Sequence, residues 1–209
     1  MAGVLLVRRV KKTMVDYLTY YYNKNKPPFQ SLSALSDPEA IQIMKDLYLE
    51  FEGSVLFERF KDPAQYLHNR RQTEQWVYES FIAKGGQPQE TYPICMVLGE
   101  SKWIKQHAPG PAATQGEIRI PLSVFQAGDV SFTCLDSMVS LWLAYEKPVE
   151  YYQPEYHGKV FTLLEILSIV EQKGLPGEEW ELNLPSNIGA YIEAQVWNHG
   201  LLLERFDIT

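Results

Sequence analysis

The residues best suited to chemistry form one group in the first half of the chain. They recur at helical spacing between residues 66 and 78: Tyr66, Arg70, Arg71, Glu74 and Tyr78. An arginine presents a rigid fork of donors for a carboxylate or phosphate, and a glutamate four residues away can fix that fork or move a proton. The pattern predicts a cleft in which Tyr66, Arg70 and Arg71 bind an anionic small molecule and Glu74 is catalytic. The alternative is an ion pair at the edge of the core, where the arginine stem covers apolar surface.

A second group precedes the last predicted helix. It contains Tyr151, Tyr152, Pro154, Tyr156 and His157. Aromatic rings with polar tips suit a ligand wall or a protein interface. We therefore take His157 as a second catalytic candidate and Tyr152 as a substrate contact. The alternative is an aromatic loop that simply packs on the sheet.

The established linear motifs are absent from the sequence. It contains no phosphate-binding glycine loop, no nucleophile elbow, and no H-E-x-x-H or C-x-x-C pattern. The four histidines are scattered, so no metal site is predicted and the cofactor is unknown. Cys95 and Cys134 stand in apolar runs, where a free cysteine behaves as a small hydrophobe.

Three helices that could position these groups have readable ends. We expect them over residues 36–53, 62–83 and 162–173. The first and the third begin with capping boxes, Ser36-Asp37-Pro38-Glu39 and Thr162-Leu163-Leu164-Glu165. The second starts with an Asp-Pro pair and stops at a Gly-Gly pair, which are typical helix boundaries.

Strand patterns fill much of the remaining sequence. We expect strands over 14–22, 92–98, 117–120, 129–134, 191–197 and 201–206, with a hairpin turn at 198–200 joining the last two. Helices and strands do not alternate regularly, so we predict an α+β fold. It is a single domain over residues 1–209, with a largely antiparallel sheet and about three main helices packed on it. The long connection 105–116 is a candidate flexible loop or lid.

Composition and charge limit the class of protein. The chain has 209 residues, of which 45% are hydrophobic and 22% charged, and its net charge is −7. Residues 1–26 carry +5, whereas residues 135–209 carry −8. A mostly acidic surface makes nucleic-acid binding unlikely, because phosphates would be repelled. No apolar stretch is long enough to span a membrane, and a chain with few cysteines is by default expected in the cytoplasm.

Two functions remain open from the sequence. The preferred one is an acidic binding or protein-interaction module that docks a basic or aromatic-rich partner, because aromatic residues are enriched where proteins meet. The alternative is a small enzyme acting on an anionic small molecule, with Arg70, Arg71 and Glu74 lining its cleft. The residues leave the oligomeric state and the identity of any partner open.

Overall fold

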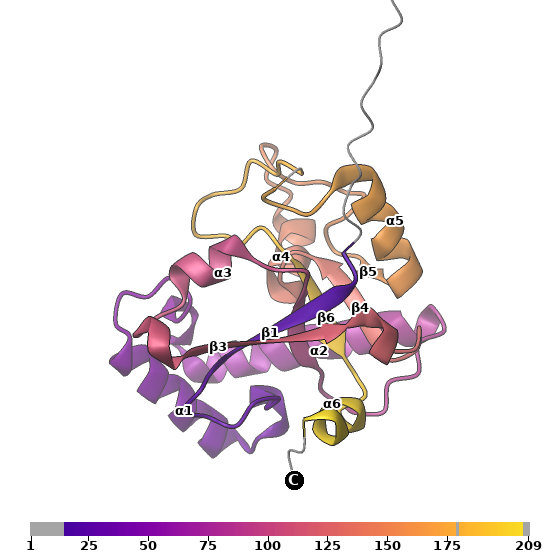
Figure 1. Cartoon of the computed structure of the whole chain (residues 1–209). Helices are drawn as coiled ribbons and strands as arrows, with labels where there is room; N and C mark the ends of the chain where they lie inside the picture. Colours follow the sequence, from indigo (N-terminus) through magenta and orange to yellow (C-terminus); the bar gives the residue numbers. More distant parts are fainter. Residues whose placement is uncertain (1–14, 179, 207–209) are drawn as a thin grey trace, which may run out of the picture.

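A six-stranded antiparallel sheet forms the centre of the computed structural model, which describes residues 15–178 and 180–206 (Figure 1). Its strands lie in the order β3-β1-β2-β6-β4-β5. Their bounds are β1 Tyr17–Asn23, β2 Ile94–Leu98, β3 Gln115–Pro121, β4 Val130–Cys134, β5 Val160–Phe161 and β6 Ile192–Val196. The sheet and its helices confirm the predicted α+β class.

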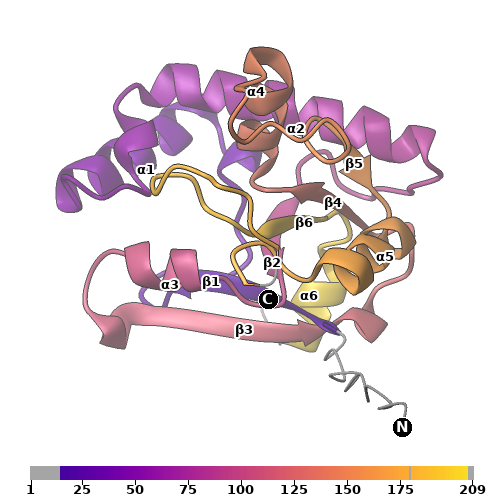
Figure 2. The same cartoon turned by 90° about the horizontal axis from the view of Figure 1, so that it is seen from above.

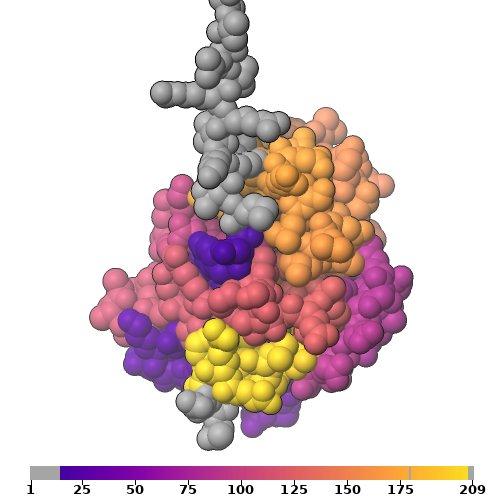
Figure 3. Space-filling view, turned by 45° about the vertical axis from the view of Figure 1, so that its right-hand side comes forward, coloured from indigo at the N-terminus to yellow at the C-terminus, as the bar shows by residue number. Residues whose placement is uncertain are grey.

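Six helices accompany the sheet in the described part of the chain. They are α1 Asp37–Glu50, α2 Pro63–Ala83, α3 Lys102–His107, α4 Ser137–Glu146, α5 Leu163–Lys173 and α6 Gly200–Arg205. The three predicted helices correspond to α1, α2 and α5, and both capping boxes are formed. Figure 2 shows α1, α2 and α4 together on one side of the sheet. In Figure 3, α5 (orange) and α6 (yellow) lie at the surface of one side of the molecule.

The central strands alternate with period two between an apolar and a polar face. The apolar face packs against α5 and α6 in the main core, and β6 contributes Ile192, Ala194 and Val196 to it. On the opposite face β6 carries Glu193 and Gln195. Alternation of this kind usually marks a strand with one face in water. Here the polar face is buried as well, because α2 and the short 3-10 helix η2 (Glu58–Phe60) cover it.

The C-terminal hairpin predicted from the sequence is wrong. Residues 200–205 form helix α6, in which the N–H groups of Leu202 and Leu203 donate to the carbonyl of His199. Leu202 is fully buried in the main core. A short apolar run fits a buried helix as well as a strand, so periodicity alone could not separate the two.

Two further segments differ from the sequence expectation. No helix is expected directly after the predicted strand 129–134, but Asp136 caps the ten-residue helix α4 there. The connection 105–116 contains the end of α3, a 3-10 turn at 112–114 and the first residues of β3, which leaves only 108–111 outside regular structure. The strand predicted over 14–22 is observed as β1, and the expectations for residues 1–14 lie outside the described residues. Within 15–178 and 180–206, no helix has the length and apolar character needed to cross a membrane.

Candidate functional site

A chain of hydrogen bonds runs across the buried polar face of the sheet. Nε1 of Trp197 donates to Oγ of Ser131 at 2.9 Å, and that hydroxyl donates to Oε1 of Gln195 at 2.9 Å. Nε2 of Gln195 donates in turn to Oγ1 of Thr133 and to Oε1 of Glu193, both at 3.0 Å. Each polar group therefore has a partner, as burial requires. The chain ends on the carboxyl group of Glu193.

Glu193 has an unusual environment for a carboxyl group. It is 6% exposed, and Oε1 also accepts from the backbone N–H of Ser137, the first residue of α4, at 3.3 Å. Burial raises the pKa of Glu193, the nearby Asp136 raises it further, and the hydrogen bonds from Gln195 and Ser137 lower it; the resulting pKa is about 7. The group is therefore populated in both protonation states near neutral pH, which suits general acid–base chemistry.

Two ion pairs surround this carboxyl group. Nη1 of Arg59, in η2, lies 3.4 Å from Oδ2 of Asp136, and Nε of Arg70 lies 2.9 Å from Oε1 of Glu74. Burial lowers the pKa of Arg59, but Tyr66 and Asp136 more than compensate and raise it above its usual value. Oδ1 of Asp136 also accepts from the backbone N–H groups of residues 138 and 139 and caps α4. Asp136 thus fixes both the arginine and the helix that donates to Glu193.

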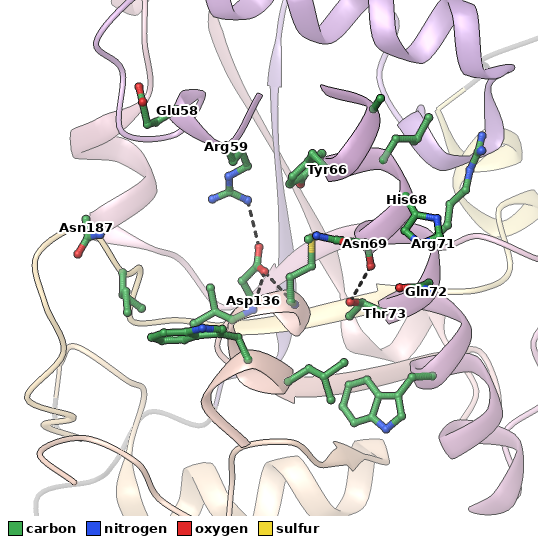
Figure 4. A pocket seen from close by; sticks show the side chains of 18 of the residues that line it. Glu58, Arg59, Tyr66, His68, Asn69, Arg71, Gln72, Thr73, Asp136 and Asn187 are labelled. Atoms are coloured by element: carbon green, nitrogen blue, oxygen red, sulfur yellow. Dashed lines mark hydrogen bonds and ion pairs between the residues drawn. The ribbon is translucent and has the colours of Figure 1, made fainter. Parts of the chain in front are cut away.

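A large cavity, with a volume of about 1360 Å³, lies between α2 and α4. Figure 4 shows Arg59 and Asp136 pointing toward one another in its wall, with Asn69 and Thr73 of α2 nearby. The wall mixes aromatic and polar side chains, among them Tyr66, His68, Arg71, Trp76, Trp142, Tyr145 and Asn187.

The smaller cavity has a volume of about 620 Å³ and brings together residues of β1, β2, β3, the end of α1 and the segment before η2. Its wall is mostly apolar and aromatic, as in many small-molecule sites. The polar part of the wall includes Arg59, Cys95, Tyr191 and Glu193, and also Lys105 and Glu117. Arg59 belongs to the walls of both cavities, so its pair with Asp136 lies where the two cavities meet.

The arginines predicted to bind substrate are already engaged by the protein. Nη1 of Arg71 pairs with Asp37 at 2.5 Å, and the guanidinium also donates to the carbonyls of Ser33 and Leu35. Arg70 donates to Oγ of Ser33 at 3.0 Å in addition to its pair with Glu74. Both arginines therefore tie α2 to the 3-10 turn η1 (Leu32–Ala34).

The predicted site residues are divided between different places. Tyr66 and Arg71 line the larger cavity, whereas the described linings of both cavities omit Arg70 and Glu74. Burial raises the pKa of Glu74, and the charge of Arg70 opposes that rise.

His157 and Tyr152 form a separate contact in the loop before β5. Nδ1 of His157 accepts from the backbone N–H of Gln153 at 3.1 Å, and the two rings lie 5.9 Å apart. Burial lowers the pKa of His157 to about 4, so its ring is neutral near neutral pH. Neither side chain belongs to the described wall of either cavity.

The sequence analysis missed Arg59, Tyr191 and Glu193 as site residues. One signal for Glu193 was present, because an acid and an amide alternate with Ile192, Ala194 and Val196 in the predicted strand. That pattern is typical of a half-exposed strand, so it hid the site. Only the position of α2 and η2 shows that these polar side chains are buried.

Comparisons with protein-family models, with curated proteins and with solved structures found no match to this chain. Among the described residues, no group of three or more His, Cys, Asp and Glu side chains is placed to hold a metal ion. The function must therefore be argued from the chemistry of the site.

Proposed function

We propose that the chain is an enzyme that binds a small organic molecule in the smaller cavity and exchanges a proton with it through Glu193. One observation carries the proposal: a buried carboxyl group with a pKa of about 7 forms part of the wall of a largely apolar cavity. Titratable groups perturbed by burial and by a specific neighbouring charge are concentrated at functional sites. This keeps the enzyme hypothesis from the sequence but moves its centre from Glu74 to Glu193.

The surrounding residues suit a reversible proton transfer. Ionised Glu193 takes a proton from the bound molecule, the electron pair of the broken bond stays on that molecule, and Glu193 returns the proton at a second position. Arg59 and Tyr191 line the same cavity and offer donors for the negative charge that develops. Burial, with the charge of Glu193, raises the pKa of the Cys95 thiol well above its usual range, so the thiolate needed for nucleophilic attack is scarce.

A direct test measures the titration of Glu193. Carbon-13 NMR of protein labelled at glutamate carboxyl groups should show one resonance with a midpoint near pH 7, and Glu193→Gln should remove it. Glu117→Gln is the matched control, because Glu117 lines the same cavity but is 40% exposed and paired with Lys105. A Glu193 midpoint near the ordinary value of about 4.3 would contradict the proposal.

A surface feature keeps the interaction module as a second candidate. Large apolar side chains are exposed at and after the end of α4, where Trp142, Tyr145 and Val149 are 44%, 76% and 94% exposed. Glu146 and Glu150 lie among them in the sequence and are exposed too. An acidic and aromatic surface fits a basic partner. Titration with lysine- and arginine-rich peptides should change tryptophan fluorescence, and Tyr145→Ala should weaken that binding.

A further inference from the structure

The charged side chains in the wall of the smaller cavity are all paired within the protein, with one exception. The wall contains Arg59, Lys105, Glu117 and Glu193. Lys105 lies 3.2 Å from Glu117, and Arg59 lies 3.4 Å from Asp136. In the described part of the chain, no lysine or arginine forms an ion pair with Glu193.

The groups behind the wall do not supply the missing cation. The positive charge of Arg70 lowers the pKa of Glu193, but Nε of Arg70 lies 2.9 Å from Oε1 of Glu74 and so already has an acidic partner. Asp136, which is also negative, acts on Glu193 in the opposite sense. The remaining titratable neighbours, Cys95 and Tyr191, both have raised pKa values and are neutral near pH 7. When Glu193 ionises, the cluster therefore carries one uncompensated negative charge.

The exposed charged residues in and beside the wall, Lys105 and Glu117 with Glu100 and Arg119, balance one another. Lys105 pairs with Glu100 at 2.8 Å as well as with Glu117. Arg119 lies 3.0 Å from Glu100 and 3.4 Å from Glu117. Two cations and two acids thus neutralise each other, and this network leaves the charge preference of the cavity to Glu193.

The rest of the wall indicates which kind of group the ligand carries besides its charge. It is built mainly from apolar and aromatic side chains, among them Tyr21, Phe51, Leu56, Phe57, Val97 and Ile104. Such a surface favours an apolar or aromatic group, and aromatic rings also attract cations through their faces.

We propose that the smaller cavity takes a small molecule that carries a protonated amine on an apolar or aromatic body, with the amine against Glu193. This inference rests on the proposed function and names the class of its ligand. It replaces the anionic molecule expected from the sequence, because both arginines of that expectation are engaged by the protein. A carboxylate ligand would add a negative charge to the uncompensated one of Glu193, whereas an ammonium group would compensate it.

The test compares three compounds of similar shape: 2-phenylethylamine, 2-phenylethanol and 3-phenylpropionate. Isothermal titration should show that the amine binds at least about tenfold more tightly than the other two near pH 8, a difference of about 1.4 kcal/mol. Affinity for the amine should fall about tenfold between about pH 8 and pH 6, because a group with a pKa of about 7 is then mostly protonated. Glu193→Gln should abolish both effects. Glu79→Gln removes an exposed acid of α2 that lies outside the described wall, so it should preserve them.

The outcomes separate the inference from the proposed function. Tighter binding of the carboxylate or the alcohol, with Glu193 still titrating near pH 7, would refute the amine as the ligand class. The proposed proton transfer by Glu193 would then remain supported. No binding of the amine at millimolar concentration would also refute the amine as the ligand class. An ordinary pKa for Glu193 would refute both the amine ligand and the proton-transfer function. Thermal melts of Glu193→Gln check that any loss of binding does not come from unfolding.

Discussion

Gln195 and Glu193 lie two residues apart on the same face of β6, and Nε2 of Gln195 donates to Oε1 of Glu193 at 3.0 Å. The same amide nitrogen donates to Thr133, while the amide oxygen accepts from Ser131. These contacts leave the Gln195 amide one orientation in which every neighbour is satisfied. The position of the Glu193 carboxyl group is therefore set by the sheet before any ligand binds, as a preorganised acid or base requires.

Replacing Glu193 by glutamine should change how stability depends on pH. The folded-state pKa of Glu193 is raised to about 7, so the folded protein holds a proton that the unfolded chain releases above about pH 4.5. Relative to Glu193→Gln, the wild-type free energy of unfolding should fall between about pH 4.5 and 7 by up to about 3 kcal/mol, and stay lower above that range. Urea unfolding of both proteins across this range measures the difference. A difference that does not vary with pH would refute the raised pKa.

Replacing Gln195 by methionine should affect both stability and the carboxyl group. The variant leaves Ser131, Thr133 and Glu193 with fewer partners in a buried site, at a cost of about 2–4 kcal/mol. The hydrogen bond from Gln195 lowers the pKa of Glu193, so its loss should move that pKa further upward. NMR titration of the Glu193 carboxyl measures this shift. Loss of stability with an unchanged pKa of Glu193 would mean that Gln195 stabilises the fold but does not affect the Glu193 carboxyl group.

The predictable parts of the fold are the elements that short local sequence patterns specify. The capping boxes at Ser36 and Thr162 identified two helices, because each cap depends on residues three positions apart. No comparable signal marks α6, where a short apolar run fits both a strand and a helix. Helix α4 was missed as well, since Asp136 fits a turn as well as it caps a helix.

The candidate site depended on contacts that the sequence does not contain. Arg59 and Asp136 are 77 residues apart, and Glu193 lies 56 residues beyond Ser137, whose N–H it accepts. Arg70 and Glu74 stood out because they are close in sequence, but helix neighbours of opposite charge are often structural. Residues that assemble from distant elements leave no spacing to recognise.

Two substitutions of Asp136 should separate its roles as a helix cap and as a charge. Asparagine keeps an acceptor for the first N–H groups of α4, whereas alanine removes it, so alanine should be less stable than asparagine by about 1 kcal/mol. Both remove the negative charge that raises the pKa of Glu193, so that pKa should fall in both. Thermal melts give the first comparison, and carboxyl NMR gives the second. Equal stability of the two variants would argue against the cap.

His157 should give a pH dependence of the opposite sign. Burial lowers the folded-state pKa of His157 to about 4. Between about pH 6.5 and 4 the histidine of the unfolded chain therefore binds a proton that the folded protein does not bind. Stability should therefore be lost as the pH falls from about 6.5 to 4, by about 2 kcal/mol after allowance for partial solvation of the ring. In His157→Asn the amide oxygen can still accept from the N–H of Gln153, and this loss should be absent. The difference between the two proteins must be measured in each buffer, because the Glu193 effect has the reverse slope over part of the same range.

The His157→Asn variant also tests the catalytic role predicted from the sequence. Amine binding and the titration of Glu193 should be unchanged in it. Loss of either in a folded His157→Asn protein would show that His157 takes part in the site.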